Sequence, residues 1–191
     1  MLISRSIACL IFVVACGGKI GPDGPGDAAA DGPVLLKDAS PPTPVVDASL
    51  PTGECTDLDV VGQSTTVELV PEEAPPFAAT GGSLAEGIYQ LTSIIEYTGP
   101  NGAGGTGGSI DDRIRITSAK NGWNIESVAT TDQQADQRSA ATATSAGNGE
   151  LLVTQYCPDA GPATATLYSF DGATLTLRID AAEEQFTLVT K

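Results

Sequence analysis

The sequence has no histidine and few basic side chains, and both shortages limit what the protein can do. Without histidine, a Ser-His-Asp triad, a Cys-His pair and a histidine-based zinc site are all excluded. Nine lysines and arginines stand against 24 aspartates and glutamates, so the net charge is −15 at pH 7. Because so acidic a surface repels phosphate, we expect neither nucleic acid nor anionic lipid headgroups as partners. We also expect no enzyme activity and no cofactor.

Long apolar runs are missing as well. The uncharged run at residues 6–15 has about ten residues, whereas a helix that spans a membrane needs roughly twenty. A short run of this kind behind Arg5 fits the core of a signal peptide. We therefore expect residues 1–15 to be a signal peptide that is removed.

The run ends in Val13-Val14-Ala15-Cys16. This stretch resembles the lipobox of bacterial lipoproteins. The resemblance implies cleavage before Cys16 and attachment of lipid to that cysteine, which anchors the protein in a bilayer of the cell envelope. Gly17, which follows the cysteine, resembles the outer-membrane sorting pattern of enteric lipoproteins. The alternatives are an ordinary signal peptide and an apolar N-terminus that is not processed.

Residues 17–53 have the composition of a disordered linker. Seven glycines and seven prolines stand in this segment, and no helix or strand period is visible in it. Together with the lipidated Cys16, residues 16–53 are therefore expected to form a flexible tether. The tether would hold the following domain away from the membrane surface.

Cysteine usage agrees with an exported protein. If Cys9 is removed with the signal peptide and Cys16 carries lipid, Cys55 and Cys157 are the two that remain. An isolated pair in an oxidising envelope usually forms a disulfide. We therefore expect a Cys55–Cys157 disulfide.

Residues 54–191 are long enough for one hydrophobic core and contain no helical stripe. Apolar and polar side chains alternate instead with a period of two, which is typical of strands. Asn121-Gly122 and Asp171-Gly172 predict tight hairpin turns. About eight strands are expected, at residues 89–97, 110–117, from 123, 138–144 (or a loop), 151–157, 164–170, 173–180 and 186–188, with residues 66–70 as an additional candidate.

Strands in sequence order joined by tight turns predict an antiparallel meander, which closes into a small up-and-down barrel or folds into a β-sandwich. Two segments, Gly87-Ile88-Tyr89-Gln90-Leu91-Thr92 and residues 168–177, resemble the first strand and the late hairpin of lipocalin-like domains. Such domains occur in uncharacterised bacterial lipoproteins of the myxobacterial type. The resemblance covers residues 80–190 and implies a lipocalin-like barrel of about eight strands.

Aromatic residues are few, at 5% of the chain, and several belong to the expected strands. If they face inward, they can line a cavity for a small apolar ligand, with the candidate residues Tyr89, Leu91, Tyr97, Trp123 and Tyr168. The function hypothesis is a lipid-anchored envelope protein that binds such a ligand. The alternative is a structural or protein-interaction module with a filled core and no ligand.

Acidic residues form three groups with the hard oxygen ligands that calcium prefers. The groups are Asp57 with Asp59, Asp111 with Asp112, and Asp180 with Glu183 and Glu184. None has the spacing of a known calcium loop. We therefore expect no metal site and interpret most of these carboxylates as a solvated surface.

Overall fold

The computed structural model describes residues 54–60, 64–131 and 134–190. The expected signal peptide (1–15) and the expected tether with Cys16 (16–53) lie outside the described residues. The described part contains nine strands and no helix, which confirms the all-β prediction. The strands are β1 (Thr65–Val70), β2 (Gly87–Tyr97), β3 (Gly105–Ala119), β4 (Gly122–Thr131), β5 (Gln134–Gly147), β6 (Glu150–Cys157), β7 (Thr164–Phe170), β8 (Thr174–Ile179) and β9 (Ala182–Thr190).

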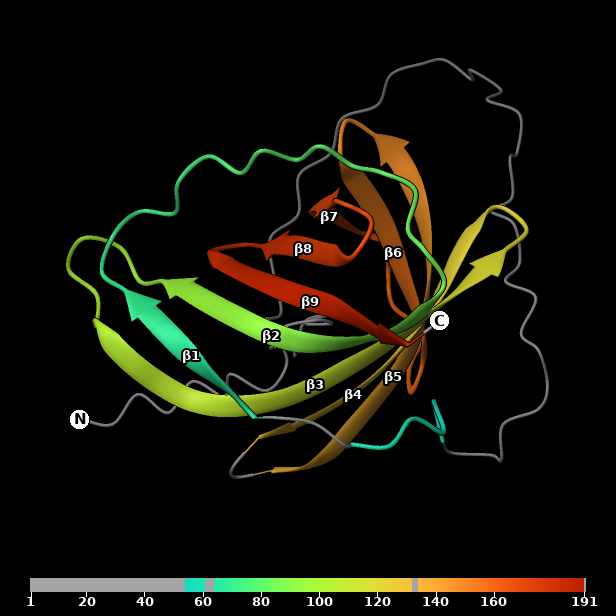
Figure 1. Cartoon of the computed structure of the whole chain (residues 1–191), viewed down its shortest axis with the longest axis horizontal. Helices are drawn as coiled ribbons and strands as arrows, with labels where there is room; N and C mark the ends of the chain where they lie inside the picture. Colours follow the sequence, from blue (N-terminus) through green and yellow to red (C-terminus); the bar gives the residue numbers. More distant parts are fainter. Residues whose placement is uncertain (1–53, 61–63, 132–133, 191) are drawn as a thin grey trace, which may run out of the picture.

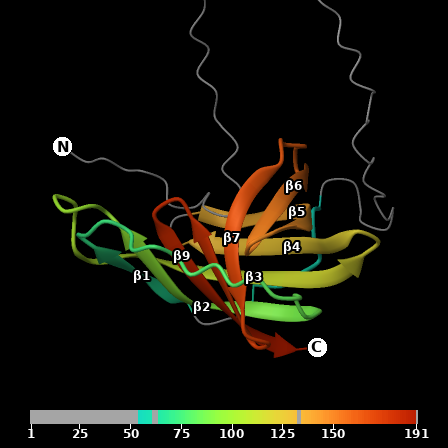
Figure 2. The same cartoon turned by 90° about the horizontal axis from the view of Figure 1, so that it is seen from above.

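All nine strands belong to one sheet, in the order β1 to β9. From β2 onward each strand is antiparallel to the next. Since β9 is also antiparallel to β2, the pairings of β2 to β9 close into a ring. Figure 1 shows β1, β2, β3 and β9 side by side. In Figure 2, β6 and β7 run steeply across the direction of β3 and β4, as expected of a sheet that curls strongly.

β1 departs from the expected antiparallel meander. It is parallel to β2 and antiparallel to β3. Parallel neighbours need a crossover of about a dozen residues or more, and residues 71–86 supply one. β1 therefore lies between β2 and β3 at the end where those two strands separate.

Both predicted hairpins form, but the first turn lies at Lys120-Asn121, one residue before the predicted Asn121-Gly122. β3 and β4 pair up to Ala119 and Gly122, directly beside Asn121. The turn between β7 and β8 is held by Asp171, whose Oδ1 accepts hydrogen bonds from the backbone N–H of Ala173 at 3.0 Å and of Thr174 at 2.7 Å. These two bonds lower the pKa of Asp171, because they favour the ionised carboxylate.

The hydrophobic core lies on the inner face of the ring. It is assembled from alternate positions of the strands, since successive strand residues point to opposite faces. The buried cluster consists of Val67, Leu84, Tyr89, Leu91, Ile94, Ile110, Ile114, Ile116, Ile125, Ala143, Leu151, Tyr168, Leu175, Leu177 and Phe186.

A second buried layer covers part of the outer face. Residues 54–60, which we call the N-terminal strap, run over β3, β4 and β5. The Cys55–Cys157 disulfide joins the strap to the end of β6, with a Cα–Cα distance of 5.5 Å. Arg138 of β5 donates from Nη1 to the carbonyl oxygens of Thr56 at 2.9 Å and Leu58 at 2.6 Å. The strap is therefore held by a covalent bond and by charged hydrogen bonds.

Candidate functional site

The hydrogen-bond ladder on one side of β2 changes partner halfway along the strand. Residues 87–90 of β2 pair with β3, and residues 94–97 pair with β1. Among the described residues, Leu91, Thr92 and Ser93 have no ladder partner on this side. We call this break, together with residues 111 and 112 of β3 opposite it, the seam.

A bulge in β2 coincides with the seam. On the other side of β2, the register with β9 shifts between Leu91 and Ser93. An extra residue in one strand bends that strand and increases its twist. The bend carries β2 away from β3, and the N-terminal half of β1 meets β3 there, with Thr65 opposite Ile110.

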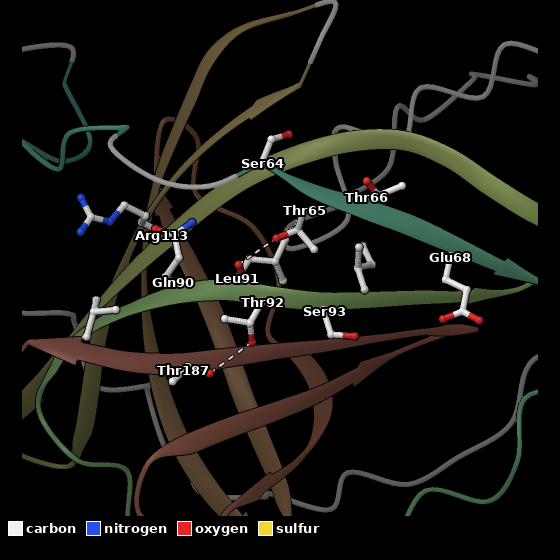
Figure 3. Close-up of a pocket in the computed structure, with 12 residues that line it drawn as sticks. Ser64, Thr65, Thr66, Glu68, Gln90, Leu91, Thr92, Ser93, Arg113 and Thr187 are labelled. Atoms are coloured by element: carbon white, nitrogen blue, oxygen red, sulfur yellow. Dashed lines mark hydrogen bonds between the residues drawn. The ribbon is translucent and has the colours of Figure 1, made fainter.

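A groove of about 700 Å³ lies over the seam on the outer face of the sheet (Figure 3). Its lining is dominated by small hydroxyl side chains from β1, β2 and β9 and the segment before β1. The residues are Ser64, Thr65, Thr66, Glu68, Gln90, Leu91, Thr92, Ser93, Ile94, Arg113, Thr187 and Val189. Arg113 stands at one end of the groove and Glu68 at the other (Figure 3). Such a surface offers donors and acceptors along its length and a charge of each sign at its ends.

Side chains bridge the seam where the ladder is interrupted. The hydroxyl of Thr65 donates to the carbonyl of Leu91 at 2.9 Å. On the β3 side, Gln90 Nε2 donates to Asp111 Oδ1 at 2.8 Å and to the carbonyl of Asp112 at 3.1 Å. Thr92 donates to the carbonyl of Gln185 at 3.1 Å. The groove floor is thus held by side-chain bonds in place of a continuous ladder.

Two carboxylates lie on the inner face beside the seam. Asp112 follows the alternation of buried Ile110 and Ile114 on β3, and Glu184 lies between buried Ala182 and Phe186 on β9. Asp112 and Glu184 are each only 3% exposed. These two acids are therefore exceptions to the interpretation of most carboxylates as a solvated surface, because their strand positions point inward.

Burial dominates the electrostatics of this pair. It raises the pKa of Asp112 well above its usual range, and the charges of Glu184 and Asp111 raise it further. Burial also raises the pKa of Glu184 to about 7. Asp112 Oδ1 and Glu184 Oε2 have no hydrogen-bond partner among the described residues. Unpartnered buried oxygens are rare in folded proteins and call for an explanation.

Four of the five residues of the predicted apolar pocket lie in or against the buried core cluster. Tyr89, Leu91 and Tyr168 belong to the buried core cluster, and Trp123 packs against its edge. The hydroxyl of Tyr89 donates to the carbonyl of Ala85 at 2.7 Å, and that of Tyr168 donates to the carbonyl of Gly82 at 2.8 Å. A cavity for an apolar ligand among these residues stays a prediction.

Tyr97 has a different neighbour, Arg178 of β8. The guanidinium carbon of Arg178 lies 5.0 Å from the Tyr97 ring centroid and 5.4 Å from that of Phe77. Arg178 Nη2 also donates to Glu183 Oε2 at 2.7 Å. Tyr97 therefore takes part in a cation–π cluster. Leu91 is the one residue of the predicted five that lines the groove described above.

Sequence reasoning missed the groove and the inner carboxylates. A signal for the carboxylates was present, since Asp112 and Glu184 occupy the apolar phase of their strands. No comparable signal marked the seam, because it arises from the partner exchange between β1 and β3.

The described residues contain no group of three or more histidine, cysteine, aspartate or glutamate side chains able to hold a metal ion. In the same part of the chain, no helix has the length and apolar character needed to cross a membrane. No protein-family model, curated protein or solved structure matches this sequence. Fold and site together define an all-β protein with one ring-like sheet and a polar groove over a break in it.

Proposed function

We propose that this protein is a lipid-anchored lipoprotein of the bacterial cell envelope, with the outer membrane as its location. Its β domain acts as a closed, lipocalin-like barrel that binds a small ligand without catalysis. Support for the anchor comes from Val13-Val14-Ala15-Cys16 and its resemblance to a lipobox. Support for the barrel comes from the pairing of β9 with β2, which leaves β2 to β9 without a free edge.

The observation that carries the binding function is the hydroxyl-rich groove over the seam. Binding sites need a concave surface with a few convergent polar groups, and the groove supplies both. Large core side chains, by contrast, occupy the interior around Tyr89 and Tyr168. These facts favour a polar ligand in the groove over an apolar ligand in the core.

A second candidate function is a protein-interaction module of the envelope. Leu152 and Leu167 are each 38% exposed on the neighbouring strands β6 and β7. Leu152 pairs with Ala165, so Leu167 is its diagonal neighbour. Exposed apolar side chains that adjoin each other favour contact with a partner protein.

Native mass spectrometry of the full chain, extracted gently from its own envelope, tests the binding function. We expect a reproducible small molecule on the wild-type protein, and its loss in Thr92→Val, which removes a hydroxyl from the groove. Thr144→Val is the matched control, because Thr144 is exposed on β5 outside the groove. A protein partner in place of a small molecule, lost in Leu152→Ser, would support the second candidate.

Membrane fractionation tests the anchor separately. Replacement of Cys16 by alanine removes the only position at which the proposed lipid attaches, so the variant should move from the membrane fraction to the soluble fraction. Cys9→Ala is the control and should stay with the membrane. Membrane attachment of the Cys16→Ala variant would contradict the lipoprotein proposal.

A further inference from the structure

The inner carboxylates lie directly behind the groove. Asp112 precedes Arg113, which lines the groove, and Glu184 pairs with Ile94, which also lines it. Leu91 and Ile94 also line the groove although their side chains belong to the buried core, so the floor of the groove is formed by β2 at the seam. The two acids thus flank β2 on its inner side, one from β3 and one from β9.

Asp112 has a small neighbour on one side and the seam on the other. Its neighbour on β4 is Ala129, a small side chain. On the other side lies the seam, where Leu91 to Ser93 of β2 have no ladder partner among the described residues. Asp112 accepts a hydrogen bond from the backbone N–H of Arg113, but its Oδ1 has no partner in the described part of the chain.

The unpartnered oxygens of Asp112 and Glu184 suit a positively charged hydrogen-bond donor. Two buried carboxylates within electrostatic range of each other destabilise the folded state unless a proton or a cation neutralises them. The nearby cations are engaged elsewhere: Arg113 Nη1 donates to the carbonyl of Asp59 at 3.2 Å, and Arg178 pairs with Glu183. Within the described residues, neither arginine therefore neutralises the two acids, and a proton or a cation from solution can take that role.

We propose that Asp112 and Glu184 bind the primary ammonium group of a small organic cation that reaches them through the seam. This inference rests on the proposed binding function and specifies the class of its ligand. An ammonium group carries three N–H donors, which suits the unpartnered Asp112 Oδ1 and Glu184 Oε2. The polar remainder of the ligand would meet the hydroxyls of the groove.

A metal ion fits this pair less well. Calcium takes six to eight oxygen ligands. Two carboxylates supply at most four oxygens, and no third acidic side chain joins them in a metal-binding group within the described residues. The site is therefore better suited to a singly charged group that needs only two acceptors.

Calorimetric titration of the full chain in nonionic detergent with putrescine tests the proposal. Tetramethylammonium, which has the charge but no N–H donor, and calcium are the comparison probes. We expect putrescine to bind and Asp112→Asn or Glu184→Gln to weaken its binding by roughly ten- to hundredfold, as for a lost charge-assisted hydrogen bond. The matched control is Asp159→Asn, an identical change at an exposed position between β6 and β7, and it should change binding by less than about threefold.

A second readout separates binding from folding. Because the buried charges are unfavourable in the empty protein, Asp112→Asn and Glu184→Gln should raise the melting temperature while they weaken putrescine binding. No putrescine binding to the wild-type protein would overturn the proposal, as would binding that is equal in all variants. Binding of calcium with exclusion of putrescine would identify a metal site and overturn it as well.

Different experimental outcomes would contradict the proposed groove function and the proposed cation site. If Thr92→Val abolishes binding of the native ligand and the carboxylate variants do not, the groove function stands and the ammonium site is wrong. If the carboxylate variants lose putrescine and Thr92→Val has no effect on any ligand, the cation site stands and the groove function is wrong.

Discussion

β3 contributes to both the N-terminal strap region and the seam, and the two regions differ in whether their charged groups are paired. On the side of the N-terminal strap, Arg115 pairs with Asp57 at 2.6 Å and with Glu126 at 2.9 Å. On the side of the seam, the same strand carries Asp112, whose Oδ1 has no partner among the described residues. The two regions lie on one strand and differ in whether the charges are compensated.

The difference teaches which region stabilises the fold and which is free to bind. Around the strap, a hydrogen bond from Arg115 and the charge of Arg115 lower the pKa of Asp57, so the ionised form is favoured. Around the seam, burial raises the pKa of Asp112 and Glu184, so the ionised form is disfavoured. Uncompensated groups cost stability, and proteins keep such costs mainly at functional sites.

The largest effect on the free energy of unfolding is expected from removal of the disulfide that holds the strap. Cys55 and Cys157 are separated by 102 positions, and a loop of this length gives a chain-entropy contribution of about 4.7 kcal/mol. The double variant Cys55→Ala/Cys157→Ala should therefore lose about 4 kcal/mol of unfolding free energy in urea. Wild-type protein with and without reductant is the control, and equal stability under the two conditions would show that the strap is held without the disulfide.

The next effect concerns the seam region and has the opposite sign. The pKa of Glu184 is about 7 in the folded protein, against 4.5 for an unperturbed glutamate. The unfolded chain then releases this proton at lower pH, so wild-type stability falls as pH rises from about 4.5 to about 7. Glu184→Gln should remove this loss and be about 3 kcal/mol more stable than wild type at pH 8.

Urea unfolding from pH 4 to pH 8 checks the prediction. Glu183→Gln serves as the control on the same strand, since Glu183 is paired with Arg178 on the outer face. A Glu184→Gln profile parallel to that of the wild type would show that Glu184 keeps an ordinary pKa.

A smaller loss is expected from Arg138, which holds the strap without a covalent bond. Its two hydrogen bonds to the carbonyls of Thr56 and Leu58 would disappear in Arg138→Met. We expect about 2 kcal/mol of destabilisation, because charged donors to buried carbonyls contribute more than neutral ones. Lys120→Met, at the exposed β3–β4 turn, should have almost no effect in the same urea titration.

The smallest predicted effect is at Thr65, whose hydroxyl bridges the seam to the carbonyl of Leu91. Thr65→Val keeps the side-chain shape and removes this bond, at a cost of about 1 kcal/mol. Amide hydrogen exchange should accelerate at Thr92 and Ser93, where the ladder is interrupted. The control is Thr66→Val, and equal acceleration in both variants would mean that the bridge does not hold the seam.

Much of the fold was predictable from local pattern. Alternation gave the strand at residues 110–117, which the structure extends to β3 at Gly105–Ala119 because glycines continue the ladder with β1. The weakly patterned segment at residues 138–144 is part of β5, where small side chains pack between β4 and β6. The additional candidate at residues 66–70 is β1, but its parallel pairing with β2 was not predicted.

Less of the candidate site was predictable. The aromatic and apolar residues expected around a cavity include Tyr89 and Tyr168, which the structure places in the buried core with their hydroxyls bonded to backbone carbonyls. Aromatic identity predicts burial well, but it does not distinguish a filled core from a lined cavity. The inner position of Asp112 followed from its phase between Ile110 and Ile114, although composition alone indicated a surface role.

The sequence by itself determined the all-β class, the hairpin turns and the face on which most strand residues lie, because alternation and turn residues act over short distances. It also contained the cysteine pair that the structure joins at Cys55 and Cys157. Only the tertiary structure decided that β1 enters between β2 and β3, and that Asp112 and Glu184 are buried within electrostatic range of each other. The physical reason is that a period of two specifies the face of a residue, whereas its neighbour across the sheet depends on which distant strand pairs with it.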